Sequence, residues 1–439
     1  MPSPGQPPGQ CYHGGSHRPP EFEPPVLAPS TASFSVNGKR YSPPPRPVAV
    51  VCMDGCADEY LDRALLLGRM PHLARIARQG FRGMARAALP SFTNTNNASI
   101  ATGAPPSVHG ISGNYFLDPD SGEPVMMNSA RFLRAPTIFA AAAAAGRNVA
   151  VVTAKDKLRE ILSTGLRGLS ISVEKAREAR RETHGVGDVE ALVGAPTPPI
   201  YSAEASIFVL QAGAAFLERE MADFLYLSLT DYVQHKHAPE EAAAVELCAA
   251  LDTQLGRLLE RGAVVGLTAD HGMNAKQQPD GGPNVVYLSR LLDEELGKDA
   301  ARVILPITDP YVHHHGALGS FAVVHLRDPE RAAWLEQRLL REPGVTEVHD
   351  RDAAARLLEL PRDRIGDLVV LSGRDVALGT RPEEHDLAAV ASGLRSHGGR
   401  YEEMVPFLVS EPLGPIHARR AQGDLRNFDI FELTTNGAG

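Results

Sequence analysis

The sequence predicts an α/β fold with a mainly parallel central sheet, flanked by helices and carrying a smaller inserted α+β subdomain. Short apolar runs bounded by Pro or Gly favour strands that are buried on both faces, which is typical of a parallel sheet. Amphipathic segments alternate with these runs and favour helices on the faces of the sheet. Between about residues 275 and 395 the alternation changes, which indicates an insertion.

Each predicted element of the core follows from one of these patterns. In chain order, the strand-like runs are 48–54 (VAVVCMD), 147–154 (RNVAVVTA), 223–231 (DFLYLSLTD), 262–270 (GAVVGLTAD) and 405–410 (VPFLVS). Segments 71–80 and 238–262 are amphipathic and each ends at a glycine, as helices often do. In the insertion, we expect strands at 320–326, 345–350 and 367–373 and helices at 329–341 and 351–360.

The predicted division of the chain has three parts. Residues 1–33 are rich in Pro and Gly and can bury little apolar surface, so we expect a disordered tail. Residues 34–274 and 396–439 form the predicted α/β core, and residues 275–395 form a predicted cap subdomain.

The composition of the chain disfavours several classes of binding partner. The formal net charge of -9 and the pI near 6.0 disfavour nucleic acid and anionic membranes as partners. No segment approaches the roughly 20 consecutive apolar residues of a membrane helix. The 4 Cys form no disulfide-like pattern, so we expect reduced thiols and a cytoplasmic location. The sequence is compatible with a homodimer.

Polar side chains follow four of the predicted strands at the point where each strand ends. They are Asp54, Lys155 with Lys157, Asp231, and Asp270 with His271. In open α/β sheets, ligands bind beyond the carboxyl ends of the strands, so these side chains are expected to share a site. A single strand-end aspartate would more often be a turn or N-cap residue. Three of them, accompanied by histidines, favour metal ligation instead.

Two further histidines fit such a site. His235 lies four residues after Asp231, so on a helical turn the two side chains share one face and can bind one metal. Gly272 interrupts the strand after His271, and the glycines after His397 allow its loop to approach closely. Oxygen and nitrogen ligands favour zinc over manganese or iron. Two metals held close together can contact both the attacking and the leaving side of a phosphoryl group.

Thr93 begins a segment that reads as a loop opening a helix, where backbone N–H groups favour an anion. A threonine hydroxyl bound to a metal can ionise near neutral pH and attack phosphorus. The alternative is a plain N-cap role, which Ser91, Thr95 or Asn96 could equally fill.

Lys155 and Lys157 lie at i and i+2, so on an extended segment they share a face. In an acidic protein, two such cations suit a substrate with a second negative end. The alternative is a pair of surface lysines in a strand-end loop. Three consecutive histidines at 313–315 diverge on an extended chain, which favours a role in the cap or behind other ligands over direct coordination.

Six short motifs, in this order, resemble the alkaline phosphatase superfamily. They are MDG at 53–55, SFTN at 91–94, GISGNYF at 110–116, TDYVQH at 230–235, ADHG at 269–272 and SHGG at 396–399. SFTN, GNY and the TAKDK segment that contains Lys155 are similar, more narrowly, to the phosphonoacetate hydrolase family. The similarity runs from about residue 35 to about residue 430. It implies an alkaline-phosphatase-like core.

The resemblance also implies a cofactor and a role for each site residue. It implies two Zn²⁺ per chain, one held by Asp231, His235 and His397 and the other by Asp54, Thr93, Asp270 and His271. Thr93 would be the nucleophile. Asn114 would bind the phosphonate oxygens, and Lys155 and Lys157 would bind the substrate carboxylate.

We therefore expect a di-zinc hydrolase that cleaves the C–P bond of phosphonoacetate to acetate and phosphate through a phospho-threonine intermediate. One alternative is a phosphodiesterase or nucleotide pyrophosphatase on the same metal site. A nucleotide substrate would require an aromatic or apolar pocket in place of the paired lysines. The other is a non-catalytic phosphonate-binding protein.

Overall fold

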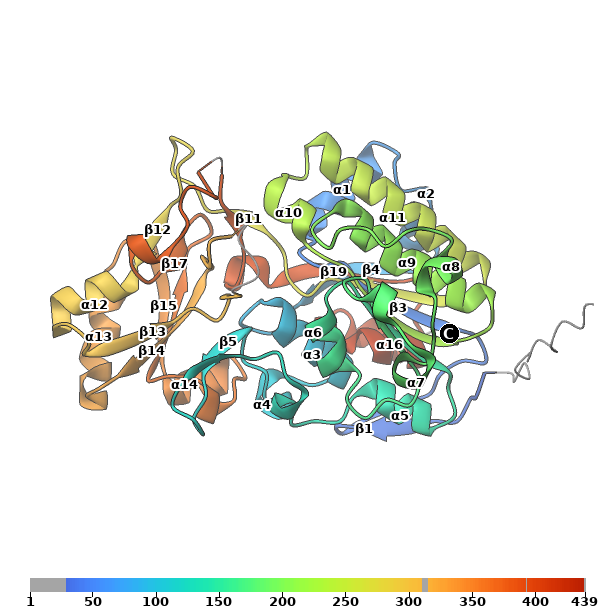
Figure 1. The fold of residues 1–439 in the computed structure, drawn as a ribbon, viewed down its shortest axis with the longest axis horizontal. Coiled ribbons are helices and arrows are strands. Elements are labelled where there is room, and N and C mark those ends of the chain that lie inside the picture. Colours follow the sequence, from blue (N-terminus) through green and yellow to red (C-terminus); the bar gives the residue numbers. More distant parts are fainter. Residues whose placement is uncertain (1–28, 310–314, 392, 438–439) are drawn as a thin grey trace, which may run out of the picture.

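The computed structural model describes residues 29–309, 315–391 and 393–437. Nearly all of the predicted tail at residues 1–33 lies outside the described residues, as do His313 and His314. The described chain has two lobes (Figure 1). The larger lobe contains a 7-stranded sheet between helices, and the smaller contains a 4-stranded sheet.

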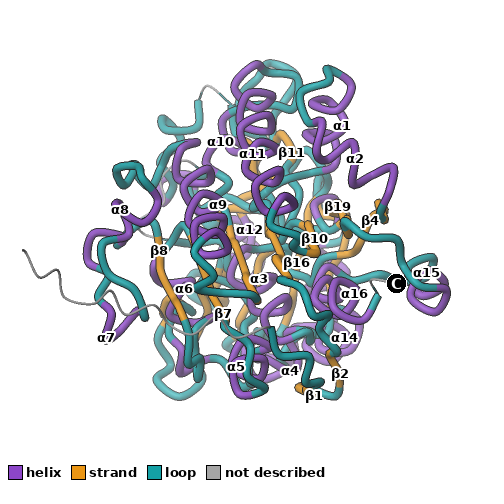
Figure 2. The backbone as a smooth tube through the Cα atoms, turned by 90° about the vertical axis from the view of Figure 1, so that its right-hand side faces the viewer, coloured by secondary structure: helices purple, strands orange, loops and turns teal. Residues whose placement is uncertain are grey.

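The central sheet confirms the predicted α/β class. Its strand order is β4 (Phe81–Arg86), β19 (Met404–Val409), β10 (Val264–Thr268), β3 (Val48–Cys52), β9 (Phe224–Ser228), β7 (Val149–Thr153) and β8 (Leu169–Ser172). The five strands from β10 to β8 are parallel, and β19 runs antiparallel to both β10 and β4. Figure 2 shows β8 and β4 at opposite sides of this sheet.

The four central parallel strands are buried at every position, which explains their unbroken apolar sequence. Each leads at its carboxyl end into a predicted site residue: Asp54 after β3, Lys155 after β7, Asp231 after β9 and Asp270 after β10. The edge strands β4 and β8 were not predicted. Their sequences, FRGMAR and LSIS, mix polar and apolar residues and lack the unbroken apolar run of the central strands, and most positions of β4 are only partly buried.

Helices cover both faces of the central sheet. In the larger lobe they are α1 (Asp58–Leu66), α2 (Pro71–Gln79), α3 (Thr93–Thr102), α4 (Pro106–His109), α5 (Ile138–Ala144), α6 (Asp156–Leu162), α7 (Arg181–His184), α8 (Val189–Val193), α9 (Ala203–Glu218), α10 (Tyr232–Lys236), α11 (Ala242–Glu260), α15 (Pro415–Arg420) and α16 (Ile430–Asn436). Helix α9 packs on β7 and β9, and α16 packs on β10 and β3 from the opposite face (Figure 1).

The smaller lobe has its own hydrophobic core. Its antiparallel sheet has the order β13 (Ala301–Ile304), β14 (Phe321–Leu326), β16 (Leu368–Ser372) and β15 (Val345–Asp350). Helices α12 (Leu288–Leu296), α13 (Ala332–Leu339) and α14 (Arg351–Leu357) and the parallel pair β12 (Val285–Tyr287) and β17 (Ala377–Gly379) complete it. All of these elements fall within the predicted cap range 275–395; the boundaries of the three parts stay a prediction.

Three two-stranded ladders connect the remaining segments. They are β1 (Phe34–Val36) with β2 (Lys39–Tyr41), β5 (Tyr115–Leu117) with β6 (Pro124–Met126), and β11 (Asn274–Ala275) with β18 (Arg395–Ser396). Across the described ranges, no helix combines the length and the apolar character needed to cross a bilayer.

Candidate active site

A cavity of about 560 Å³ lies at the carboxyl edge of the central sheet, between the two lobes. Among its lining residues are seven of the predicted site residues: Thr93, Asn114, Lys155, Lys157, Asp231, His235 and His397. The smaller lobe contributes Ile307, Asp309 and His315. The remaining predicted ligands, Asp54, Asp270 and His271, are at most 1% exposed and do not line the cavity, but His271 Nε2 lies 3.4 Å from Thr93 Oγ1.

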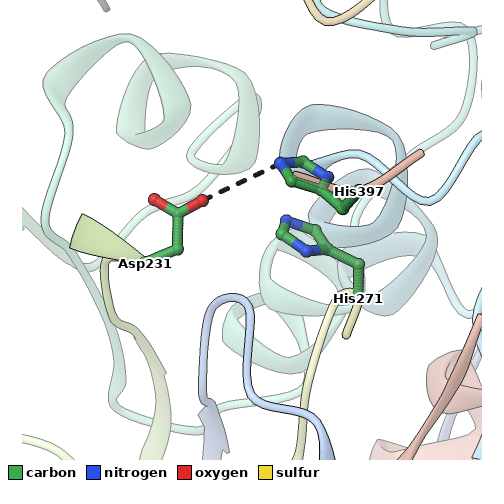
Figure 3. A group of neighbouring side chains, drawn as sticks. All are labelled: Asp231, His271 and His397. Atoms are coloured by element: carbon green, nitrogen blue, oxygen red, sulfur yellow. Dashed lines mark ion pairs between the residues drawn. The ribbon is translucent and has the colours of Figure 1, made fainter. Parts of the chain in front are cut away.

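Six buried ligand-type side chains gather here from four separate segments of the chain. Asp231, His271 and His397 bring one ligand atom each to within 4.8 Å of one another, and so do Asp54, Asp270 and His271. Figure 3 shows the first group, in which His397 Nε2 lies 3.9 Å from Asp231 Oδ2. His235 adjoins this group, because its Nε2 lies 2.9 Å from the same oxygen. Distance thus places His271 in both groups, whereas the sequence prediction had assigned it to one.

The three histidine rings are held in the orientation that a metal ligand needs. His235 Nδ1 lies 2.8 Å from the carbonyl oxygen of Arg395, His397 Nδ1 lies 2.8 Å from that of Ser91, and His271 Nδ1 lies 2.9 Å from that of Gly272. A carbonyl oxygen only accepts, so each Nδ1 carries a proton and donates it. In the neutral form of each ring, the Nε2 lone pair therefore faces the site, which is the orientation of a metal-binding histidine.

Two of these Nε2 atoms face a carboxylate oxygen. His235 Nε2 is 2.9 Å from Asp231 Oδ2, and His271 Nε2 is 3.3 Å from Asp54 Oδ1. With Nδ1 already protonated, both atoms of each pair carry lone pairs. Such a contact is repulsive unless a proton or a metal cation lies between the two atoms.

The charge balance of the site favours a cation. Burial, and then the negative charges of Asp231 and Asp270, raise the pKa of Asp54 well above its usual value. Burial alone would lower the pKa of His271, but Asp270 and Asp54 raise it to about 10. For His397, burial and the neighbouring charges of His271 and His235 lower the pKa. Buried carboxylates packed this closely are costly unless positive charge neutralises them.

Asn97 is a buried residue of the site that the sequence prediction missed. Its side-chain amide donates to Asp270 Oδ2 at 3.0 Å and to the carbonyl oxygen of Thr93 at 3.0 Å. Its Oδ1 accepts hydrogen bonds from the Tyr226 hydroxyl at 2.6 Å and from Ser228 Oγ at 2.8 Å. Asn97 therefore joins the start of α3 to a candidate metal ligand.

Thr93 is the first residue of α3, as expected for the opening of a helix. The preceding residue, Phe92, has an extended backbone and caps the helix. Thr93 Oγ1 lies 3.4 Å from His271 Nε2. In the same wall, Asn114 Oδ1 accepts from the backbone N–H of Asn94 at 3.3 Å, and the Asn114 N–H donates to the Pro306 carbonyl at 2.8 Å. The hydroxyl, a helix N-terminus and an amide thus share one wall.

The loop that carries His397 approaches α3 closely, as its glycines suggested. Gly398 has φ +124°, and a Cβ built there would lie 2.4 Å from Phe92 Cε1. Only glycine fits this position without moving the ring.

The two lysines lie at the start of α6, where the sequence prediction had placed an extended segment. Lys155 directly precedes the helix and Lys157 is in its first turn, and both line the cavity. Burial alone would lower the pKa of Lys155, but the negative charges of Asp231, Asp54 and Asp309 raise it above its usual value. Lys155 is therefore positively charged, and it lines the cavity together with Asp309 and Tyr201.

Of the histidine triplet, His315 is described, and it is buried in the cavity wall. Its ring centroid lies 5.4 Å from that of His235, and its Nδ1 accepts from the Ala317 N–H at 3.1 Å. His237 instead lies at the surface, where it contacts Glu241 at 2.9 Å.

The donor set fits divalent metal ions. Carboxylate oxygens and imidazole nitrogens converge in two groups, and the buried carboxylates need neutralisation. The chain thus holds two overlapping groups of residues that can bind metal.

Comparison with known proteins identifies the family of the chain. A family model described as type I phosphodiesterase / nucleotide pyrophosphatase matches residues 48–400. Two crystal structures of phosphonoacetate hydrolase from Sinorhizobium meliloti 1021, one in complex with phosphonoacetate and one with phosphonoformate, are 50% identical to this chain. Each has a TM-score of 0.89, and the match covers 93% of this chain and 100% of theirs.

A more distant likeness concerns the fold alone. Murine ectonucleotide pyrophosphatase / phosphodiesterase 5 is 17% identical with a TM-score of 0.58, and the match covers 88% of this chain and 94% of that chain.

Proposed function

The chain belongs to the type I phosphodiesterase / nucleotide pyrophosphatase family, and we propose that within it this protein hydrolyses the C–P bond of phosphonoacetate to acetate and phosphate. The 50% identity with a phosphonoacetate hydrolase over that protein's whole length supports the proposal. The observation that carries the proposal is the lining of the cavity. Thr93 lies beside the two ligand groups, and it lines the same cavity as Lys155. A nucleophile next to cations and a separate lysine suit a substrate with a phosphonate at one end and a carboxylate at the other.

We propose two Zn²⁺ per chain as the cofactor. Asp231, His235 and His397 would hold one ion, and Asp54, Thr93, Asp270 and His271 would hold the other; the shared donor chemistry and the Nε2 orientations support this division. When bound, zinc supplies Lewis-acid stabilisation of the phosphonate oxygens and favours ionisation of a hydroxyl bound to it.

In the proposed reaction, Thr93 Oγ loses its proton and attacks phosphorus. The Thr93 O–P bond forms as the C–P bond breaks, and the bonding electron pair passes to carbon. This charge delocalises into the carboxylate as an enolate, which Lys155 and Lys157 stabilise. Protonation of the carbon gives acetate. Water then hydrolyses the phospho-threonine, which releases phosphate and restores the hydroxyl.

Asn114 and the first backbone N–H groups of α3 would orient the phosphonate. The Asn114 side-chain amide is oriented by the backbone N–H of Asn94, which donates to Oδ1 at 3.3 Å, and the N-terminus of a ten-residue helix favours an anion. A cytoplasmic location is also our proposal, supported by the buried free thiols of Cys52, Cys56 and Cys248.

The direct test is phosphate release from phosphonoacetate by the full chain, with and without a chelator. We expect turnover that chelation abolishes and zinc restores. The same assay includes p-nitrophenyl phosphate esters and diesters, because hydrolysis of a diester at a higher kcat/KM than phosphonoacetate would favour the phosphodiesterase alternative. Zinc binding without turnover of any of these compounds would favour the non-catalytic alternative.

A further inference from the structure

A fully buried ion pair between the segments that follow His271 and His397 takes no part in the proposed chemistry. Lys276 Nζ lies 2.8 Å from Glu402 Oε1, and both side chains are 0% exposed. Removing a charged pair from water costs free energy, so a gain in stability does not by itself explain why this pair is buried. Its neighbours indicate a more specific role.

Glu402 binds the two chain segments that carry His271 and His397. Its Oε1 accepts from Asn274 Nδ2 at 2.7 Å as well as from Lys276, and its backbone carbonyl accepts from the Gly272 N–H at 2.8 Å. These three partners belong to the segment directly after His271. Its Oε2 accepts from the Gly399 N–H at 3.1 Å, two residues after His397.

Lys276 adds links to the same framework. Its Nζ donates to the Arg374 carbonyl at 2.7 Å, and its backbone N–H donates to the Leu394 carbonyl at 2.8 Å. The short ladder of β11 with β18 joins the same two segments, through Asn274 opposite Ser396 and Ala275 opposite Arg395. One segment follows His271 and the other leads into His397.

The two histidines so connected are in direct contact. Their rings stack with centroids 3.5 Å apart and planes 5° from parallel. In the proposed division they belong to different zinc sites. The relative position of the two segments therefore sets the relative position of the two ligand groups.

We infer that Lys276 and Glu402 are positioning residues that fix the spacing of the two metal sites. This inference rests on the proposed function, since it assumes that both groups bind zinc. Neither residue lines the cavity, so neither contacts substrate. Residues that orient metal ligands from behind typically change metal affinity or activity when they are substituted.

The test compares Glu402→Gln with Asp252→Asn in the full chain. Both substitutions turn a buried carboxylate into an amide. Asp252 also accepts backbone hydrogen bonds, from His72 at 3.0 Å and Leu73 at 2.7 Å, but it does so at the start of α2, away from the ligand groups. A purely structural effect should therefore appear in both variants. An amide has one acceptor oxygen, so the side chain introduced by Glu402→Gln cannot accept from both the Lys276 side and the Gly399 side.

We expect Glu402→Gln to weaken zinc binding by about 10- to 100-fold, measured by competition with a chromophoric chelator, and to lower kcat by a similar factor. KM for phosphonoacetate should stay within about twofold, because the lysines and Asn114 are unchanged. Asp252→Asn should lower the melting temperature and leave zinc affinity and kcat unchanged. Lys276→Met removes the two hydrogen bonds of Nζ and keeps those that Glu402 makes with Asn274 and Gly399, so it should give the same pattern more weakly, including if Glu402→Gln does not fold.

The inference is overturned if the Glu402 and Lys276 variants lose thermal stability but bind zinc and turn over as the wild type does. Failure of the proposed function would look different, because the wild-type chain itself would then bind no zinc or release no phosphate.

Discussion

The side-chain amide of Asn97 donates a hydrogen bond to Asp270 Oδ2 at 3.0 Å, which fixes a candidate metal ligand to the helix that begins at Thr93. Asp270 Oδ1 accepts backbone hydrogen bonds from Gly55 at 3.2 Å and from its neighbour His271 at 3.1 Å. The carboxylate is thus held on both sides. Through Asn97, Thr93 and Asp270 are therefore joined as one hydrogen-bonded unit.

Replacing this amide should loosen that unit. Asn97→Ala leaves the buried Tyr226 hydroxyl without its acceptor, so we expect a loss of about 1–3 kcal/mol in the free energy of unfolding. Zinc affinity and kcat should also fall, which chelator competition and phosphate release would measure. Tyr226→Phe is the control, since it removes one donor to Asn97 and leaves the contact with Asp270. Unchanged zinc binding in Asn97→Ala would contradict the role we assign.

Thr93 and Thr95 provide a matched pair of hydroxyls on the same helix. Thr93→Ala should abolish phosphate release, with a loss of at least about 10³-fold in kcat, while the fold is retained. Thr95→Val should be nearly neutral, because its hydroxyl is buried and makes no hydrogen bond among the described residues. Circular dichroism and phosphate release check both variants. Full activity of Thr93→Ala would contradict the proposed mechanism.

The residues that could be found from sequence are those that end apolar strands. Asp54, Asp231 and Asp270 follow runs that only a buried parallel strand explains, and such strands deliver their carboxyl ends to one edge. His235 followed from helical spacing. Both rules rest on local sequence patterns, and the fold then brings these residues together in space.

Asn97 and Glu402 could not be found in this way. Each acts through partners far away in sequence, and a buried Asn within a helix or a Glu in a short 3-10 turn has no pattern that separates it from a surface residue. The lysine pair shows the opposite case: Lys155 and Lys157 were expected to share the site, but they do so through the first turn of α6. Both side chains line the cavity, as the sequence predicted, but the predicted reason, an extended segment, was wrong.

Lys155 should act on the carboxylate end of the substrate. Lys155→Met keeps the length of the side chain and removes the charge, so we expect KM for phosphonoacetate to rise and kcat to fall, by about 10²-fold together in kcat/KM. Hydrolysis of p-nitrophenyl phosphate, which has no carboxylate, should change much less. Lys175→Met is the charge-matched control, because Lys175 pairs with Asp156 at 3.2 Å and is not a lining residue of the cavity. An equal loss with both substrates would rule out a carboxylate-specific role.

Metal removal should destabilise the larger lobe. Asp54, Asp231 and Asp270 are buried side by side, so a chelator leaves their mutual repulsion without compensation. A ligand present at about 1,000 times its Kd stabilises a protein by about 4 kcal/mol, so chelation should lower the melting temperature measurably, and zinc should restore it. Asp54→Asn removes one of the charges, and its melting temperature should respond less to chelation. A chelator that leaves the wild-type melting temperature unchanged would argue against metal binding.

A buried histidine outside the site predicts how stability depends on pH. Burial, with a smaller effect of the positive charge of Arg364, lowers the pKa of His109 from 6.5 to about 3. Its neutral ring is fixed between Ser99 Oγ at 2.8 Å and the Ile111 N–H, which donates to Nδ1 at 3.1 Å. The native state therefore binds fewer protons than the unfolded state below about pH 6.5, and the contribution of this histidine is lost as the pH falls towards 3.

The slope from this one group approaches about 1.4 kcal/mol per pH unit. His109→Asn retains an acceptor for Ile111 and cannot titrate. Its stability deficit relative to the wild type should be constant above about pH 7.5 and should shrink as the pH falls towards about 5. Thermal unfolding of both proteins in the presence of a chelator separates this effect from metal release, because metal affinity is itself pH-dependent. A deficit that stays constant across this range would show that folding does not lower the pKa of His109.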